Sequence, residues 1–372
     1  LADILLRYSE SLSIFPETKE IFQSHYPNFK NKNLVQKDLA NTLKIIASEG
    51  KKGFYEGEIA EKISKKITEN NGLISKSDLK KYNPIWRDPL ISNYRDTKVI
   101  TMGPPSSGGL HVIQMLNILE NYDLNKIGHN SSEYINLLAE VMKYAYADRS
   151  KYLGDPDFYE VPIKKIISKE YANEISKNIE IGKLRPAKQI HPGKFMRKES
   201  HETTHFSVVD KQGNVVSMTY TLNSTFGSKV VIEGTGILMN NEMDDFSAAP
   251  GVPNQFNLLG AEANEIAPFK RPLSSMTPTI VLKNDELFFT TGSPGGARII
   301  SAVLQSILNI IDFNMNLEDT TLAKRIHHQW YPDILEYEFS LDKIIENDLK
   351  KIGYKTSSKL PLTSLQTIMF AD

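Results

Sequence analysis

The sequence predicts an α+β fold in which helices cover antiparallel β-strands. Helical periodicity dominates the chain before the segment 180–202, and β-like runs followed by further helices dominate after it. Connections of hairpin length join most of the β-like runs, which favours antiparallel pairing. A chain of 372 residues is long enough for one large layered domain or two smaller ones.

The region before residue 180 is predicted to be mainly helical. Apolar residues recur at helical spacing in 38–50 and 56–72, and the first of these segments stops at Gly50. Two short β-like runs around a turn lie within 89–103. The loop PPSSGG, residues 104–109, opens the next helix, and a serine caps the helix after it. The predicted helices of this region are 38–50, 56–72, 109–122 and 131–150.

Residues 180–202 contain two prolines and several basic residues without apolar periodicity, which predicts an exposed connector. The chain then becomes rich in β-like runs. The predicted strands are 203–210, 215–223, 230–240, 277–283 and 286–292. The predicted helices that close the chain are 297–311, 318–328 and 341–352.

Composition excludes several classes of function. The 44 Lys and Arg residues balance 45 Asp and Glu without forming a basic tract, so nucleic acid is not an expected partner. No run approaches the roughly 18 apolar residues that span a bilayer. The lack of cysteine excludes disulfides and thiolate metal sites but leaves the compartment open. The opening LADILLRYSE has neither an initiating Met nor a signal-peptide pattern, so we expect a processed chain or a fragment.

Two neighbouring strands are predicted to form a hairpin that places Thr203 opposite Thr221. Three residues separate Asp210 from Asn214, which suits a hairpin loop with Gly213 in the left-handed conformation. Residue 210 then faces residue 214, and counting outward pairs the two threonines with Cβ atoms about 4.5–5.5 Å apart. A two-residue loop would shift the register by one residue and separate them.

Thr203 lies at the junction between the predicted connector and the sheet. A break of the peptide bond before it would create a terminal threonine, whose α-amine can take the proton from its own hydroxyl. Thr221 would hold that hydroxyl by a hydrogen bond, and Asn223 lies on the same strand face. Threonines in strands are simple β-formers in roughly nine cases of ten, but the junction favours the nucleophile here.

The segment TTGSPGGARII places a strand, a glycine-rich turn and a helix in succession. Backbone N–H groups of Gly295 and Gly296 would then point at whatever lies at the helix N-terminus. Phosphate is one candidate, but the Lys-Ser/Thr pair of a P-loop is missing here and after PPSSGG. An oxyanion hole suits a hydroxyl nucleophile better. A plain tight turn is the alternative, at about even odds for the motif alone.

Two further segments, NNEMDDFS and RPLSSMTPT, supply carboxylates and paired hydroxyls in expected loops. Each alone would be ordinary surface. Together they suit a ligand that carries both an ammonium and a carboxylate, with Glu242 and Asp245 binding the first and Ser274 and Ser275 the second.

His327 and His328 are adjacent in a predicted helix, where neighbouring side chains point in different directions. No Glu or His at ligand spacing accompanies them. We interpret both as structural and expect neither a metal site nor a cofactor.

Seven motifs, in order along the chain, closely resemble those of the γ-glutamyltranspeptidases, also called glutathione hydrolases, and above all the bacterial members. The motifs are PPSSGG, YADRSKYLGDPDF, TTHFSVVD, TYTLNSTFG, NNEMDDFSAAPGVPN, KRPLSSMTPTIV and TGSPGGARII. The resemblance covers nearly the whole chain. It implies an αββα sandwich of the N-terminal-nucleophile hydrolase type.

The resemblance also implies a precursor that cuts itself into two subunits at the bond between Glu202 and Thr203. Residues 1–202 would be the C-terminal part of the large-subunit region, and 203–372 would be the small-subunit region. The implied reaction is attack on the γ-glutamyl amide of glutathione or a related compound, formation of a γ-glutamyl ester, and transfer to water or to an amino acid or dipeptide. The resemblance implies the same roles for the nucleophile, its partner threonine, the oxyanion turn and the ligand-binding carboxylates and serines as those given above. It adds Asn223 to the residues that bind the substrate α-amino group. A periplasmic or secreted location is implied as well.

Two departures from the family pattern bear on the site. A lid loop is expected over 250–261, where Phe256 stands in place of the Tyr that many relatives carry. An arginine that pairs with the substrate carboxylate in the family has no counterpart before Leu1, and the chain stops short of the usual end. Within this chain, Arg271 is the first candidate for that role.

Two alternatives stay open. A cephalosporin-acylase-like amidase would share fold and nucleophile but accept an acyl group without the α-amino carboxylate. An uncleaved, inactive relative would serve as a binding or structural protein. The carboxylates and paired serines argue against the first alternative, and the intact nucleophile and oxyanion turn argue against the second.

Overall fold

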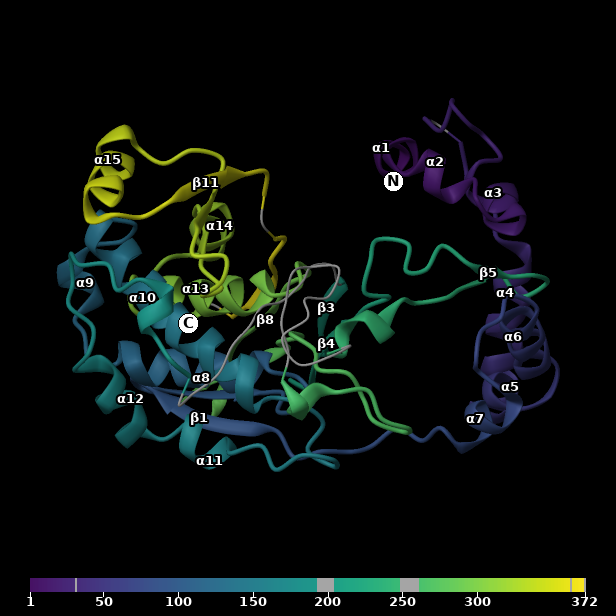
Figure 1. Ribbon diagram of the computed structural model, residues 1–372, viewed down its shortest axis with the longest axis horizontal. Helices are drawn as coiled ribbons and strands as arrows, with labels where there is room; N and C mark the ends of the chain where they lie inside the picture. Colours follow the sequence, from purple (N-terminus) through teal and green to yellow (C-terminus); the bar gives the residue numbers. More distant parts are fainter. Residues whose placement is uncertain (31, 193–203, 248–260, 362, 371–372) are drawn as a thin grey trace. The chain divides into compact units, whose positions relative to one another are not determined.

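The computed structural model describes residues 1–30, 32–192, 204–247, 261–361 and 363–370. The chain forms two compact units (Figure 1). The smaller unit comprises Leu1–Trp86 and Ser224–Asn241, and the larger unit comprises Arg87–Asn223 and Glu242–Asp372. Every predicted site residue that the structure describes belongs to the larger unit.

The smaller unit is mainly helical, as the sequence predicts. Its helices are α1 (Ala2–Arg7), α2 (Ser9–Leu12), α3 (Pro16–Phe22), α4 (Lys37–Glu49), α5 (Lys51–Tyr55), α6 (Gly57–Glu69) and α7 (Lys76–Lys81). The helices predicted over 38–50 and 56–72 correspond to α4 and α6, and α4 ends at Gly50, whose φ of 60° favours glycine. On α6, Ile59 and Ile63 share one face and are both buried, because residues four apart lie side by side on a helix.

The single strand predicted over 230–240 is wrong. The structure has two short strands, β5 (Val231–Ile232) and β6 (Ile237–Leu238), which pair antiparallel with each other. Between them Gly234 and Gly236 both have φ of 66°, in the left-handed region. The two glycines turn the chain back on itself, so the apolar run folds into a tight hairpin.

The larger unit is built on a five-stranded sheet of order β1-β2-β7-β8-β12. The strands are β1 (Leu90–Tyr94), β2 (Thr97–Thr101), β7 (Thr279–Lys283), β8 (Glu286–Gly292) and β12 (Gln366–Met369). All neighbouring pairs are antiparallel, as predicted. β2 pairs with β7, from Thr97 with Lys283 to Thr101 with Thr279. The sheet therefore contains chain from both sides of the predicted cleavage bond.

Helices cover one face of this sheet. The helices of the larger unit are α8 (Gly108–Leu119), α9 (Leu124–Ile127), α10 (Ser132–Tyr152), α11 (Ile163–Ile166), α12 (Lys169–Ser176), α13 (Arg298–Ile311), α14 (Leu317–Leu322) and α15 (Lys343–Ile352). α8 contacts β1 and β2, α13 contacts β8, and α10 and α12 pack on α8. The predicted serine cap is confirmed, since Ser131 Oγ accepts a hydrogen bond from the Tyr134 N–H at 3.1 Å. Among the described residues, no helix has both the length and the apolar character needed to cross a membrane.

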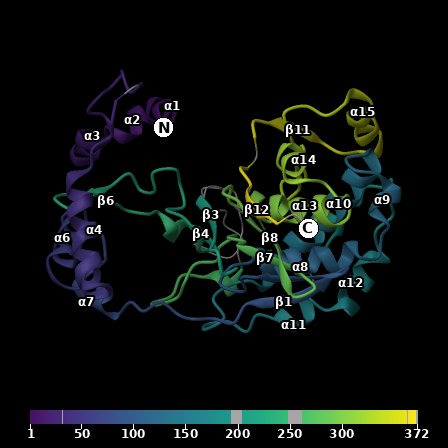
Figure 2. The ribbon, with the colours of Figure 1, turned by 180° about the vertical axis from the view of Figure 1, so that it is seen from behind.

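The predicted hairpin covers the other face of the sheet. It consists of β3 (Thr204–Val209) and β4 (Val215–Tyr220), and Figures 1 and 2 both show it beside β8. On β8, Thr290 Oγ1 lies 3.5 Å from Ser207 Oγ of β3, whereas Thr291 Oγ1 lies 3.5 Å from Ser306 Oγ of α13. Successive strand residues point to opposite faces, so the hairpin and α13 lie on opposite sides of β8. Helices, sheet and hairpin are thus three stacked layers.

The register of the hairpin is the predicted one. Thr204 pairs with Tyr220, and the Asp210 N–H donates to the Asn214 carbonyl at 3.0 Å. Gly213 has φ of 82°, the left-handed conformation that a three-residue loop requires. Local turn chemistry therefore fixes which residues face each other across the hairpin.

A three-stranded sheet near the end of the chain replaces part of a predicted helix. It consists of β9 (Ile326–His327), β10 (Leu335–Glu338) and β11 (Thr356–Lys359), in the order β11-β10-β9. The helix predicted over 318–328 ends with α14 at Leu322. The following residues pair with β10, where Arg325 forms an ion pair with Glu338 at 3.0 Å. Pairing with a distant strand overrides local helix propensity here.

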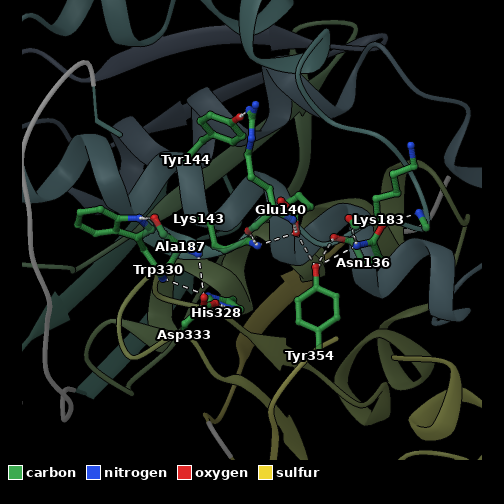
Figure 3. Close-up of polar contacts among 12 residues, drawn as sticks. Asn136, Glu140, Lys143, Tyr144, Lys183, Ala187, His328, Trp330, Asp333 and Tyr354 are labelled. Atoms are coloured by element: carbon green, nitrogen blue, oxygen red, sulfur yellow. Dashed lines mark hydrogen bonds and ion pairs between the residues drawn. The ribbon is translucent and has the colours of Figure 1, made fainter. Parts of the chain in front are cut away.

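The connector predicted to be exposed over 180–202 is partly buried in its described portion. Ala187 and Ile190 are buried, and the indole N–H of Trp330 donates to their carbonyls at 2.9 and 3.1 Å. The Ala187 N–H donates to the Asp333 carboxylate at 2.8 Å (Figure 3). Side chains from after the predicted cleavage bond therefore hold backbone from before it.

α10 holds the same segment through a buried ion pair (Figure 3). Lys143 is 0% exposed, and its Nζ donates to the Glu140 carboxylate at 2.6 Å and to the Arg185 carbonyl. Asn136 Nδ2 donates to the Lys183 carbonyl at 2.9 Å. The predicted exposure holds for much of the described segment but not for Ala187 and Ile190, because backbone contacts anchor the chain there and apolar periodicity does not predict such contacts.

Candidate active site

The end of β4 positions two of the predicted residues. Thr221 Oγ1 accepts a hydrogen bond from the Asn223 N–H at 2.8 Å. Asn223 is buried and has φ of 69°, a conformation that asparagine adopts more readily than most residues. The chain thus turns sharply after the hairpin. Thr203, Glu202 and Phe256 lie outside the described residues, so their predicted roles stay predictions.

The two predicted ammonium ligands lie in one turn of 3₁₀ helix, Glu242–Asp245. Burial raises the pKa of both carboxyl groups. The charge of Glu242 raises the pKa of Asp245 further, while the positive charge of Arg149 lowers it. Two adjacent, partly buried carboxyl groups repel each other when both are ionised, so they retain a proton or bind a cation. A ligand ammonium meets that requirement.

The loop PPSSGG supports the predicted carboxylate-binding serines. The Ser107 N–H donates to the Ser274 carbonyl at 2.8 Å, and Ser106 forms an isolated parallel bridge with Ser274. A β-carbon on Gly108 would stand 2.1 Å from Thr277 Oγ1 and 2.6 Å from the Met276 carbonyl oxygen. Close approach of two backbones therefore requires this glycine. The packing accounts for the motif without a bound phosphate.

Asn264 joins the predicted ammonium and carboxylate sites. Its Nδ2 donates to the Asp245 carbonyl at 2.7 Å, and its Oδ1 accepts from the Leu273 N–H at 3.0 Å. Leu273 directly precedes Ser274 in the chain, and the Asn264 side chain is buried. A single fixed side chain thus ties together two segments that the sequence singled out separately.

Arg149, which the sequence analysis did not single out, links α10 to the same loops. Its Nε donates to Ser107 Oγ at 2.7 Å, and its Nη2 donates to Ser275 Oγ at 3.3 Å. The residue is 5% exposed, and burial lowers its pKa to about 9, against the opposing effects of Tyr146 and Asp245. At neutral pH it is protonated and supplies a buried positive charge. Arginine in the last turn of a helix is common, so its position alone carried no signal.

The turn GSPGG leads into α13, as predicted. Gly295 and Gly296 have φ of 129° and 56°, conformations that favour glycine. The Tyr146 hydroxyl donates to the carbonyl of Ala297, the next residue, at 2.5 Å. The turn is therefore anchored to α10 at the start of the helix. Its role as an oxyanion hole stays a prediction.

The other polar residues discussed from the sequence have structural partners. The Arg271 N–H donates to Asp155 at 2.8 Å, and its guanidinium lies 3.7 Å from Asp157. Arg149 donates to Ser275, one of the predicted carboxylate-binding serines.

The two adjacent histidines are buried, and His327 lies in β9 instead of a helix. His327 Nδ1 lies 2.9 Å from Ser301 Oγ, and His328 Nε2 lies 3.2 Å from the Asp333 carboxylate. Over the residues that the structure describes, no group of three His, Asp or Glu side chains is arranged to hold a metal ion.

Sequence comparison relates the whole chain to known proteins. The sequence model of the family described as gamma-glutamyltranspeptidase matches residues 1–372. The chain is 49% identical over 371 residues to the glutathione hydrolase proenzyme of Escherichia coli (strain K12), covering 99% of this chain and 64% of that protein. It is 39% identical over 322 residues to the acylase ACY 1 proenzyme of Pseudomonas sp. (strain SE83), covering 87% of this chain and 55% of that protein. The chain thus spans less than two thirds of the length of either relative.

Structural comparison confirms the predicted fold class. The chain resembles the crystal structure of cephalosporin acylase from Bacillus halodurans with a TM-score of 0.82 and 24% identity, over 100% of this chain and 66% of that chain. The two chains therefore share an α+β fold.

Proposed function

Because the chain belongs to the γ-glutamyltranspeptidase family, we propose that it transfers the γ-glutamyl group of glutathione and related amides to water or to an amino acid or dipeptide. The bridge that Asn264 makes between Asp245 and Leu273 carries this proposal. It supports the proposal because it links the segment of the carboxylates proposed to bind an ammonium to the segment of the serines proposed to bind a carboxylate. A γ-glutamyl group has an ammonium and a carboxylate on one carbon atom, so it needs both kinds of partner at close range.

Maturation comes first in the proposed mechanism. The Thr203 hydroxyl attacks the Glu202 carbonyl carbon, the peptide C–N bond breaks, and the released nitrogen becomes the Thr203 α-amine. Water then hydrolyses the ester and frees the hydroxyl. Residues 1–202 belong to the large subunit in this scheme and 203–372 to the small subunit. The pairing of β2 with β7 supports it, because that ladder would hold the two subunits together after cleavage.

Catalysis uses the same hydroxyl. The Thr203 α-amine takes the hydroxyl proton as Oγ1 attacks the γ-carbonyl carbon, and Thr221 orients the nucleophile. The amides of Gly295 and Gly296 stabilise the tetrahedral oxyanion. The leaving amine takes a proton as the C–N bond breaks, which leaves a γ-glutamyl ester on Thr203. Water or an acceptor amine then attacks the ester and regenerates the enzyme.

Substrate recognition falls to the residues around this centre. Asn223, Glu242 and Asp245 bind the α-ammonium group, and Ser274 and Ser275 bind the α-carboxylate. The raised carboxyl pKa values support the first assignment, because burial raises both values and the charge of Glu242 raises that of Asp245 further, and a bound cation favours the ionised forms. Phe256 serves as an apolar lid residue. The location proposed for the protein is periplasmic or secreted.

A cephalosporin-acylase-like amidase is the second candidate, favoured by the 39% identity to an acylase proenzyme. The two functions differ in what the acyl site must recognise. A glutaryl group has the carboxylate of a γ-glutamyl group but lacks its ammonium, so the partly buried pair of Glu242 and Asp245 would have no cation to bind.

The test compares two chromogenic amides on the purified full natural protein. The γ-glutamyl-transferring enzyme should mature into two bands on a denaturing gel and cleave γ-glutamyl-p-nitroanilide far faster than glutaryl-p-nitroanilide. Faster cleavage of the glutaryl compound would favour the acylase. A single uncleaved band without activity on either compound would favour an inactive relative.

A further inference from the structure

The loop that follows α10 binds the chain just ahead of the paired serines. Asp155 lies in this loop, and its side chain is 0% exposed. One carboxylate oxygen, Oδ2, accepts a hydrogen bond from the Arg271 N–H at 2.8 Å. The other, Oδ1, accepts from the Asp157 N–H at 3.1 Å and from Arg87 Nη2 at 3.3 Å. Both oxygens are hydrogen-bonded, so the buried carboxylate is held in one orientation.

Arg87 fixes the same loop from its other side. Its Nη1 and Nη2 donate to the two oxygens of Asp157 at 3.0 and 2.6 Å. This hydrogen bonding raises the pKa of Arg87 and lowers that of Asp157. A guanidinium that binds a carboxylate through two parallel hydrogen bonds has a defined orientation. Asp155 is therefore paired with a fixed cation, while its Oδ2 faces the serine segment.

The two residues before Asp155 pack against the same segment. Leu153 belongs to the same small buried cluster as Leu273. A β-carbon on Gly154 would stand 2.0 Å from the Ala263 carbonyl oxygen, so two backbones approach each other closely there. Three consecutive residues of the loop thus pack on or bind the stretch 263–273.

The backbone that leads into Ser274 is anchored at each of its N–H groups. The pairs are the Arg271 N–H with Asp155 at 2.8 Å, the Leu273 N–H with Asn264 Oδ1 at 3.0 Å, and the Ser274 N–H with the Pro105 carbonyl at 2.9 Å. Residue 272 is a proline, whose ring fixes φ and removes the N–H group. Asp155 provides the first of these anchors and the one that carries a charge, so its loss would release the start of the segment.

We propose that Asp155 is a positioning residue for the α-carboxylate of the γ-glutamyl donor, acting through the Arg271 backbone on Ser274 and Ser275. The inference rests on the proposed function and deepens it. Asp155 precedes the predicted cleavage bond and the two serines follow it. The large-subunit region thus sets the orientation of the carboxylate ligands that the small-subunit region supplies.

The experiment compares Asp155→Ala and Asp155→Asn with the wild-type full natural protein on two anilides. One is γ-glutamyl-p-nitroanilide, and the other is 4-aminobutyryl-p-nitroanilide, which keeps the amine but lacks the α-carboxylate. We expect Asp155→Ala to raise KM for the γ-glutamyl compound by about tenfold, a usual loss for a hydrogen bond that involves a charge, with a much smaller change in kcat. The kcat/KM for the 4-aminobutyryl compound should change far less.

Asp155→Asn should raise KM by a smaller factor. The amide keeps one acceptor oxygen but presents an NH₂ group to one of the two sets of donors that the carboxylate binds. A general loss of folded protein would lower the apparent kcat and leave KM unchanged, so KM separates positioning from a purely structural role.

Asp312→Ala is the matched control, since it removes another buried carboxylate of the larger unit that is bound to an arginine. Asp312 accepts from the Tyr94 hydroxyl at 2.7 Å and from Arg95 Nε at 3.1 Å. Its loss should lower stability without raising KM or separating the two substrates. An unchanged KM in Asp155→Ala, or equal losses on both anilides, would overturn the proposal.

If Asp155→Ala does not mature, Asp155→Asn provides the same substrate comparison, and a wild-type KM in that variant would overturn the proposal. Failure of the wild type to prefer γ-glutamyl-p-nitroanilide over glutaryl-p-nitroanilide would count against the proposed function itself.

Discussion

The imidazole of His205 on β3 lies directly against Gly292 of β8, so closely that a β-carbon on residue 292 would stand 2.2 Å from the ring atom Cε1. His205 Nδ1 lies 2.8 Å from Thr219 Oγ1 on β4. Burial lowers the pKa of His205 to about 4, so the ring is neutral at pH 7. The contact holds the hairpin against the sheet two residues after Thr203, and it requires glycine at position 292.

Gly292→Ala should push the hairpin away from the sheet. We expect a loss of stability of about 1–3 kcal/mol from overpacking, together with slower self-cleavage, because the predicted nucleophile precedes the displaced strand. Thermal unfolding and a gel time course of maturation measure the two effects. Gly103→Ala is the control, since the atoms nearest to its β-carbon would be those of the flexible Leu90 side chain, the first at 3.2 Å. Equal behaviour of the two variants would show that the His205 contact does not position the hairpin.

Thr203→Ala should abolish both self-cleavage and turnover, because one hydroxyl performs both attacks in the proposed mechanism. Thr203→Ser should retain both at a lower rate. A denaturing gel and an anilide assay provide the measurements. Complete maturation of the alanine variant would remove Thr203 as the nucleophile.

Thr221→Ala should leave the fold intact, since one hydroxyl hydrogen bond contributes about 1 kcal/mol. The hydroxyl accepts from the Asn223 N–H at 2.8 Å, so its loss should also loosen the turn after β4. We expect a lower kcat at nearly unchanged unfolding temperature. Unchanged kcat would contradict the predicted pairing of Thr221 with the nucleophile.

Asp245→Asn should change stability with a defined pH dependence. Burial and the neighbouring Glu242 raise the pKa of Asp245 in the folded protein. A carboxyl group whose pKa is higher in the folded than in the unfolded protein makes the fold more stable at low pH than at high pH. This stability is lost as the pH rises through the raised pKa of the folded state. The variant should therefore unfold at a higher temperature than wild type at pH 8 but not at pH 4. It should also bind γ-glutamyl substrates more weakly, while glutaryl compounds are affected less.

Asp285→Asn is the control for that pH dependence. Asp285 is an exposed carboxylate whose pKa is lowered by its hydrogen bond to Lys98. Its replacement should give no gain in unfolding temperature at pH 8. A gain of equal size in both variants would mean that the effect is one of overall charge.

Lys143→Met should destabilise the protein strongly. Removing one partner of a buried ion pair leaves the other charge unpaired, which costs about 3–5 kcal/mol, and here it also removes a donor to the Arg185 carbonyl. The double variant Glu140→Gln with Lys143→Met should recover much of the loss in chemical denaturation. A double variant as unstable as the single one would show that the contact with the connector, and not the ion pair, dominates.

The sequence by itself determined the elements whose causes are local. The hairpin register follows from three loop residues and the left-handed Gly213, so it could be derived before any tertiary contact was known. Helices with a clear apolar period, such as α4 and α10, begin and end close to their predicted limits. The paired serines and carboxylates were recognisable because the members of each group are close together in the sequence.

Only the tertiary structure decided which of these segments meet. Arg149 reaches Ser275, 126 residues further along the chain, and Ser106 lies beside Ser274 across 168 residues. The buried part of the connector depends in the same way on Trp330 and α10. Hydrophobic periodicity and turn propensity depend only on a residue and its close neighbours in the sequence. The contacts named here form when distant segments pack together, because their buried polar groups must then hydrogen-bond to one another instead of to water.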